Sequence, residues 1–220
     1  MTTVGLGRIR AVERALTAGR FGTYLTHLGG RDYPGALSLY EWNAKISSAF
    51  ILPLHICEVS VRNAAAEAIE SVYGPRWPWS SGFERSLPTP VRGYNPKNDL
   101  INSRRGCTTA GKVIPELKFA FWNDLFTSRH DQRLWNPHFR TCFPNAPKAA
   151  STARLRAAIY DHLSAIRKFR NRVAHHEPIF RAPLGNDYSR LTLLVRWRCC
   201  ETSAWLTGLQ GVTGLLTFRS

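Results

Sequence analysis

Apolar residues recur at helical spacing along most of the chain, and no stretch shows the alternation that marks a half-buried strand. The clearest stripe lies within residues 151–176 and consists of Leu155, Ile159, Leu163, Ile166 and Val173. Arg170 shares this stripe, because it lies seven positions after Leu163 and three before Val173. The pattern therefore predicts that Arg170 faces a core or a subunit interface. Pro178 is expected to end the helix, since proline disfavours helical geometry at the preceding residue.

Two further segments in the amino-terminal half have helical periodicity. Residues 8–28 predict one amphipathic helix, in which Gly22 is a candidate interruption. Residues 36–73 predict either a helical hairpin or one helix kinked at Pro53, because proline removes a backbone donor and clashes with the preceding turn. Residues 74–90 are rich in proline and tryptophan and predict a loop packed on the core.

The carboxy-terminal half adds a central helix and a last helix. Residues 115–126 are apolar on nearly every side and predict a buried helix, and residues 189–206 predict the last one. Residues 91–111 predict a polar loop that carries Arg104 and Arg105. This loop either follows RNA phosphates or is simply solvated. The whole pattern predicts an all-α fold, a helical bundle with additional helices and long loops.

Composition narrows the class of protein. A net charge of +15 over 220 residues favours contact with a polyanion, with nucleic acid as the first candidate and mere solubility as the alternative. The length suits one domain over residues 1–220. The five cysteines include no CxxC pair, which argues against a disulfide framework and a zinc ribbon. No signal-peptide core or run of about 18 apolar residues occurs, so we expect a cytoplasmic protein without a membrane span.

Polar chemistry concentrates at the end of the 151–176 helix, where cations, an amide, two imidazoles and a carboxylate follow one another. Asn171 and His175 are four residues apart and share a helix face. Arg170 and His175 are five apart, which places them about 140° apart around an ideal helix. They cannot converge on one ligand from a straight helix within one chain. Either the helix deforms near its end or a second copy supplies one of the groups.

The motif Arg170-Asn171-x-x-x-His175 resembles the signature of HEPN ribonucleases. The wider string over residues 170–180 is similar to the Abi-like branch of that superfamily, which is associated with abortive infection and toxin–antitoxin systems. Parts of residues 40–64 and 111–122 are also similar to that branch. The resemblance implies a HEPN-like all-helical bundle and a homodimer whose motifs face each other. It further implies RNA cleavage without a metal ion or other cofactor.

RNA can be cut by its own 2′-OH, which attacks the adjacent phosphorus. Histidine suits the two proton transfers because its pKa lies near neutrality, and arginine suits the phosphate because its planar fork donates two hydrogen bonds. We therefore assign acid–base catalysis to His175, phosphate clamping to Arg170, and orientation of His175 or a scissile oxygen to Asn171. The residues expected to contact RNA elsewhere are Arg167, Lys168, Arg172, His176, Arg104 and Arg105.

The predicted function is that of a metal-independent endoribonuclease that acts as a toxin or antiviral (abortive-infection) effector. Two alternatives stay open: an RNA-binding module without catalysis, and a basic interaction protein that pairs with an acidic antitoxin. The residues have alternatives too. In the alternative interpretation, Arg170 is a buried structural arginine paired with Asp161 or Glu41. The alternative for His175 is that it caps the end of the helix.

Other polar residues are expected to have structural roles. His176 and Glu177 are interpreted as supporting residues, with direct participation as the alternative. A metal site at His175-His176-Glu177 is not expected, because adjacent helical residues point in different directions and HExxH is absent. Glu58 and Arg62 are four residues apart and able to form an ion pair on their own helix. Arg62 and Asn63 are interpreted as a structural pair or cap that supports this helix, with RNA contact as the alternative.

Overall fold

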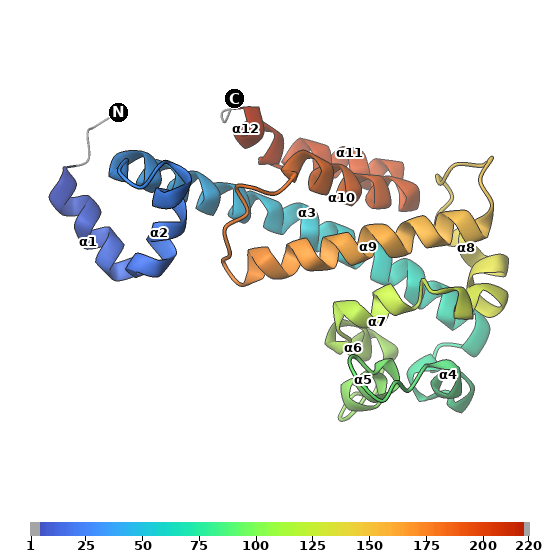
Figure 1. The fold of residues 1–220 in the computed structure, drawn as a ribbon. Helices are drawn as coiled ribbons and strands as arrows, with labels where there is room; N and C mark the ends of the chain where they lie inside the picture. The colour runs from blue at the N-terminus through green and yellow to red at the C-terminus, as the bar shows by residue number, and fades with distance from the viewer. Residues whose placement is uncertain (1–4, 218–220) are drawn as a thin grey trace.

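The computed structural model describes residues 5–217, which form twelve α-helices and no strand (Figure 1). The all-α prediction is therefore confirmed. Helix α3 (Tyr33–Tyr73) runs along the length of the molecule, and α9 (Thr152–Ala174) lies antiparallel beside it. Helix α10 (Leu184–Arg198) packs against both.

Helix α3 is one continuous helix of 41 residues with Pro53 inside it, so the hairpin alternative is wrong. The Asp32 carboxylate caps its start by accepting from the Gly35 N–H at 2.8 Å, and Gly74, with a φ of 77°, ends it. The residues that keep it whole are buried on both sides of the proline: Ile46, Phe50, Leu54, Cys57 and Val61. Their burial outweighs the cost of about 3 kcal/mol that proline brings to a helix interior.

By length and composition alone, α3 is also able to cross a membrane. The core helix of a soluble protein passes the same test. Here the apolar side of α3 forms a wall of the main core, against α9 and α10.

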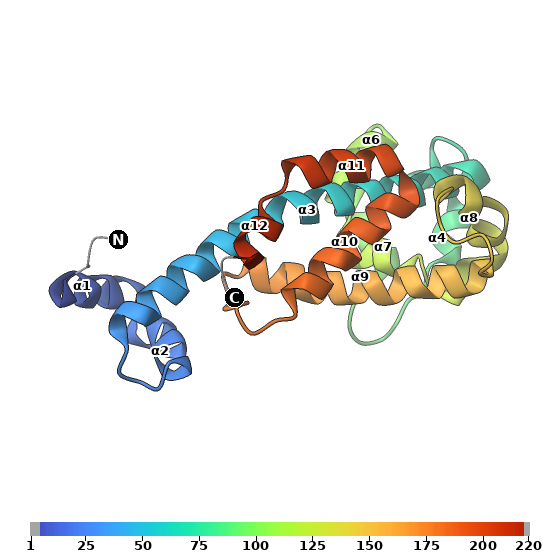
Figure 2. The same cartoon turned by 90° about the horizontal axis from the view of Figure 1, so that it is seen from above.

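The amino-terminal segment forms two helices where one was expected, α1 (Leu6–Leu16) and α2 (Ala18–His27). The break falls at Thr17 and not at Gly22: Thr17 has a φ of 71°, and its hydroxyl accepts from the Arg20 N–H at 3.5 Å. The two helices pack at the beginning of α3, beyond the end of the main bundle (Figure 2). Their small core contains Ile9, Phe21, Tyr24, Ala36 and Phe180.

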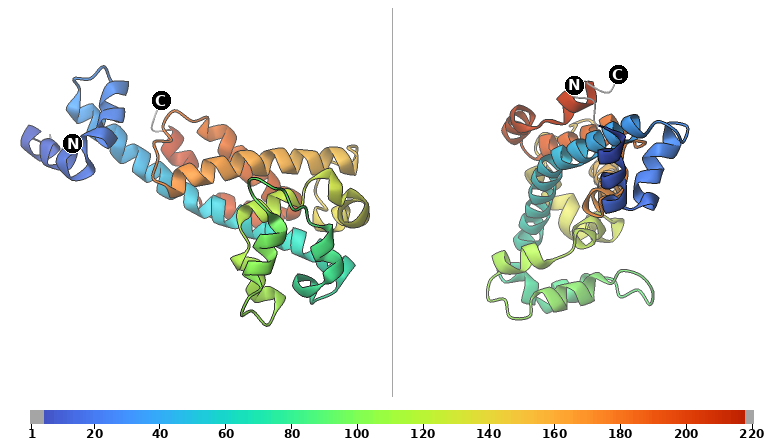
Figure 3. Two further views of the ribbon diagram at one scale, coloured as in Figure 1. Left: turned by 60° about the horizontal axis from the view of Figure 1, so that its bottom comes forward. Right: turned by 90° about the vertical axis from the view of Figure 1, so that its left-hand side faces the viewer.

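The region that follows α3, up to the end of α7, is more helical than expected, but its helices are short (Figure 3). Its elements are η1 (Trp77–Trp79), α4 (Ser81–Ser86), α5 (Pro96–Ser103), α6 (Ala110–Val113), η2 (Ile114–Glu116) and α7 (Phe119–Asp124). The two predicted loops at residues 74–90 and 91–111 therefore contain helices. The helix predicted over 115–126 begins only at Phe119, because Pro115 lies in a 3-10 turn and Lys118 is extended.

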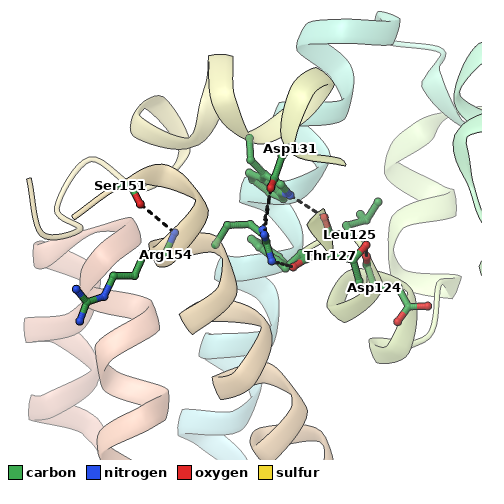
Figure 4. A network of polar contacts seen from close by, with 9 residues as sticks. Asp124, Leu125, Thr127, Asp131, Ser151 and Arg154 are labelled. Carbon is green, nitrogen blue, oxygen red and sulfur yellow. Dashed lines mark hydrogen bonds and ion pairs between the residues drawn. The ribbon is translucent and has the colours of Figure 1, made fainter. Parts of the chain in front are cut away.

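A polar network joins the next segment to the first turns of α9 (Figure 4). This segment comprises η3 (Ser128–His130), the π-helical turn η4 (Asp131–Trp135) and α8 (Asn136–Cys142). The Arg156 guanidinium of α9 donates to both carboxylate oxygens of Asp131, at 2.9 and 3.1 Å. The Trp135 indole donates to the Leu125 carbonyl at 2.6 Å. The contact of Arg156 with Asp131 fixes the end of α9 opposite the Arg170 motif, and the Trp135 hydrogen bond ties η4 to the end of α7.

The predicted last helix over 189–206 is also divided. Helix α10 ends at Arg198, and α11 (Cys200–Leu209) and α12 (Val212–Thr217) follow. Cys199 is extended, with a φ of −156°, and its thiol accepts from the Thr202 N–H at 3.5 Å. This cap starts a new helix that folds back, and the Trp42 indole of α3 donates to the Leu215 carbonyl at 3.1 Å.

His130 gives the fold a defined pH dependence. Burial, and secondarily the Arg129 cation, lower the pKa of His130 from 6.5 to about 4. Between these pH values the unfolded chain binds a proton that the folded chain does not, so stability should fall as the pH drops through this window. Between pH 7 and pH 4.5 the expected loss is about 2 kcal/mol in the free energy of unfolding. Urea denaturation at pH 7 and pH 4.5 measures it. His130→Gln should lose less stability than the wild type between these two pH values, by about this amount; equal losses in the two proteins would contradict the assignment.

Candidate functional site

Helix α9 keeps its regular form up to Ala174 and ends in a compact backbone turn. Three hydrogen bonds close that turn: His175 N–H to Asn171 O (2.9 Å), His176 N–H to Val173 O (3.1 Å) and Glu177 N–H to Arg172 O (2.9 Å). His176 has a φ of 55°, a left-handed conformation that glycine usually supplies at this position. Because the helix stays regular, Arg170 and His175 remain about 140° apart around it.

The segment that follows this turn is held by α2 and α3. The Asn43 side-chain oxygen accepts from the N–H groups of Ile179 at 2.8 Å and Phe180 at 3.1 Å. The Arg20 guanidinium donates to the His176 carbonyl at 2.9 Å. Asn43 is only 6% exposed, so it satisfies two backbone donors that water does not reach. These contacts fix the path of the chain directly after His175.

Sequence reasoning did not single out Asn43 or Arg20. A signal for Asn43 was available, because it lies three positions before Ile46 and seven before Phe50, on the buried stripe of α3. A buried amide on an apolar stripe needs a partner. Arg20 carries no comparable signal, since its partner lies 156 residues away.

The three predicted catalytic residues are all exposed. Within residues 5–217, the side chains of Arg170, Asn171 and His175 form no hydrogen bond or ion pair. The alternative in which Arg170 is a buried arginine paired with Asp161 or Glu41 is therefore wrong; Glu41 pairs with a lysine one turn away on α3. The His175 backbone occupies the end of α9, but its imidazole does not cap the helix. These groups are available to a ligand.

Arg170 lies in a groove between α3 and α9 of about 300 Å³. Around α9 it points within about 20° of the buried residues Ile159 and Leu163. It is nevertheless exposed, because α3 and α9 leave an open groove beside this turn, although Phe169 and Val173 on either side of it are buried in the main core. The prediction that Arg170 faces a core is therefore wrong within one chain. Ile51 on the opposite wall is 54% exposed, which makes this groove partly apolar.

The α3 wall of this groove carries polar groups outside the predicted catalytic set. His55, Glu58 and Arg62 line it together with Arg170. Glu58 forms no ion pair with either arginine in the part of the chain that the structure describes, so the pair that its spacing allows with Arg62 is not formed. The Nε atom of Arg62 is buried without a hydrogen-bond partner. Two guanidinium groups thus border one groove without a bound carboxylate.

A second groove of about 410 Å³ adjoins the first, since Ile51 and Ala174 line both. His176 of the turn described above lines it, together with Asn43 of α3. Ser47 also lines it, and its hydroxyl is buried without a partner. The two grooves form a trough along α3 that passes the end of α9. The trough has room for an extended ligand or for side chains of another protein.

The cations around the motif differ in their availability. Lys168 is exposed and lies three residues before Asn171 and seven before His175, on one face of α9. Arg172 instead donates to the Pro178 carbonyl, and its Nε atom lies 3.5 Å from the Glu177 carboxylate. Arg172 therefore stabilises the helix end, and the supporting role expected for Glu177 has a structural basis.

The remaining predicted RNA contacts lie farther along the chain. Arg167 is half-buried near Asp124 of α7; burial raises the pKa of Asp124, and the Arg167 cation opposes the rise. Arg104 donates to the Glu84 carboxylate and to the Pro78 carbonyl, both at 2.8 Å. This pairing lowers the pKa of Glu84. Arg104 therefore ties α5 to α4, which does not fit a loop that follows RNA phosphates, whereas Arg105 is exposed.

The chain matches no family model, no curated protein and no solved structure. The roles predicted for Arg170, Asn171 and His175 accordingly stay predictions that rest on the chemistry and placement of these residues. No group of three or more side chains that could hold a metal ion lies together within residues 5–217.

Proposed function

We propose that the protein is a metal-independent endoribonuclease of the HEPN type, acting as a toxin or abortive-infection effector. The observation that carries the proposal is the exposure of Arg170, Asn171 and His175, without side-chain partners, at one end of a regular helix. A structural arginine and histidine would be expected to have partners. The net charge of +15 adds an attraction for nucleic acid.

The reaction needs two proton transfers and charge stabilisation. The 2′-oxygen loses its proton and bonds to phosphorus, while the bond from phosphorus to the 5′-oxygen breaks and that oxygen gains a proton. The products are a 2′,3′-cyclic phosphate and a free 5′-OH. His175 performs proton transfer, and Arg170 binds the phosphate oxygens as negative charge develops on them.

Two copies of the chain supply the complete site. Within one chain, Arg170 and His175 point about 140° apart, so they do not reach the same phosphate. A second copy seated on the α3–α9 groove brings its own motif to this one. That arrangement provides two imidazoles, one for each proton transfer, and covers the exposed Ile51 side chain.

Residues of α3 complete the phosphate site. Arg62 borders the same groove as Arg170 and has a buried Nε donor without a partner. The Nε atom itself is out of reach of a ligand, but as a cation that lines the groove Arg62 is able to bind a phosphate oxygen through the rest of its guanidinium. His55 and Glu58 lie on the same wall and set the polarity of the groove.

The experiment is incubation of purified protein with end-labelled RNA in the presence of EDTA. Cleavage that survives the chelator and leaves 2′,3′-cyclic phosphate ends supports the proposal. Salt-sensitive binding of intact RNA would favour the RNA-binding module without catalysis. Absence of both, together with capture of an acidic partner protein, would favour the antitoxin-binding alternative.

A further inference from the structure

A cationic pocket of about 440 Å³ lies at the other end of the α3–α9 pair. Three arginines from three elements line it: Arg85 of α4, Arg129 of η3 and Arg133 of η4. Ser86 and His130 complete the wall. The neighbouring Asp131 is bound to Arg156 in the second turn of α9, which places the pocket about 20 Å from Arg170 by the helical rise of 1.5 Å per residue.

The charge of this pocket is not balanced by the protein. No carboxylate lines it, and Arg85 and Arg129 form no ion pair within the described part of the chain. Arg133 contacts the Tyr73 hydroxyl at 3.5 Å. The nearest acids in sequence are engaged elsewhere: Glu84 binds Arg104 and Asp131 binds Arg156. Three neighbouring cations repel one another unless an anion lies between them.

His130 supplies a second, independent feature. It is only 4% exposed and lines the pocket, yet its imidazole forms no hydrogen bond within residues 5–217. Although the residue is almost fully buried, its ring nitrogens keep some accessible surface, so a ligand in the pocket can reach them. Such a ligand would provide a partner, by accepting the imidazole N–H.

We propose that this pocket binds a phosphate group, held by Arg85, Arg129 and Arg133 and contacted by His130, at a site separate from the Arg170–His175 centre. Phosphate fits better than a carboxylate, because it carries more charge and offers three oxygens to three guanidinium forks. The phosphate belongs either to a free phosphorylated small molecule or to an RNA strand.

The test is isothermal titration with inorganic pyrophosphate and, separately, with a 2′-O-methyl RNA oligonucleotide that cannot be cleaved by its own 2′-OH. Wild-type protein should bind one or both saturably, and Arg85→Ala/Arg129→Ala should weaken that binding by about tenfold or more. The matched control, Arg31→Ala/Arg154→Ala, removes the same charge from exposed arginines elsewhere. It should leave the affinity nearly unchanged.

The two titrations distinguish a free phosphorylated molecule from an RNA strand as the source of the phosphate. Pyrophosphate binding that depends on Arg85 and Arg129 indicates a free small molecule, while dependence seen only with the oligonucleotide indicates RNA. Equal weakening in the two double variants, or no saturable binding of either probe, would overturn the proposal. Thermal denaturation checks that the variants are folded, and the single variant Arg129→Glu should abolish binding through its reversed charge.

Discussion

Replacing His175 by alanine should slow RNA cleavage by about 10²- to 10⁴-fold, the range of a positioned general acid or base. The imidazole is exposed and has no partner in the described chain, so the substitution removes the proton-transfer group without breaking a structural contact. Single-turnover cleavage of labelled RNA in EDTA measures the rate, and thermal denaturation should show an unchanged midpoint.

The matched control is His176→Gly. The adjacent histidine differs in its backbone, since its φ of 55° is one that glycine adopts freely. Its carbonyl accepts from Arg20, and that contact survives the loss of the side chain. His176→Gly removes an expected RNA contact but no proton-transfer group, so it should slow cleavage far less than His175→Ala. A large loss in His176→Gly with a normal rate in His175→Ala would reverse the assignment of the two histidines.

Asn43→Ala should lower the free energy of unfolding by about 2–4 kcal/mol, because it leaves two buried backbone donors, those of Ile179 and Phe180, without an acceptor. Cleavage should slow as well, since the segment after His175 loses its anchor on α3. Urea denaturation gives the first quantity and the cleavage assay at a temperature well below unfolding gives the second.

Asn63→Ala is the matched control for this prediction. Asn63 is an exposed asparagine of the same helix whose side chain forms no hydrogen bond within residues 5–217. The substitution should change the stability by less than about 0.5 kcal/mol. Equal effects of the two substitutions would mean that Asn43 does not anchor the segment.

The existence of the helices followed from the sequence more readily than their ends. The stripe from Leu155 to Val173 predicted α9 to within two residues at each end, because a continuous apolar face fixes a helix. Thr17 and Cys199 divide two predicted helices, yet neither residue type is a usual breaker. Their conformations depend on how the flanking helices pack, which local pattern does not encode. Pro53 shows the reverse, since burial around it overrides a strong local signal.

The sequence predicted which residues form the candidate site, but it did not predict the groove and the neighbouring side chains that surround them. The direction of Arg170 around α9 was right, but a periodic pattern does not reveal where the neighbouring helix leaves a groove. Lys168 and Arg172 look alike in the sequence; only the placement of Pro178 and Glu177 makes Arg172 structural. Arg62 was interpreted as a structural residue of α3, with RNA contact as the alternative. Its proximity to Arg170 depends on contacts more than a hundred residues apart in the chain.

The central claim is that two copies of the chain share one catalytic site. Co-expression of Arg170→Ala and His175→Ala chains with different affinity tags allows the mixed dimer to be purified and assayed against each homodimer. The mixed dimer retains one guanidinium and one imidazole from different chains, whereas each homodimeric variant lacks one kind of group entirely. It should therefore cleave RNA measurably faster than either homodimeric variant, but more slowly than the wild-type dimer, because it has lost the second imidazole. A mixed dimer as inactive as the two homodimers, or a chain that forms no dimer at all, would contradict the account.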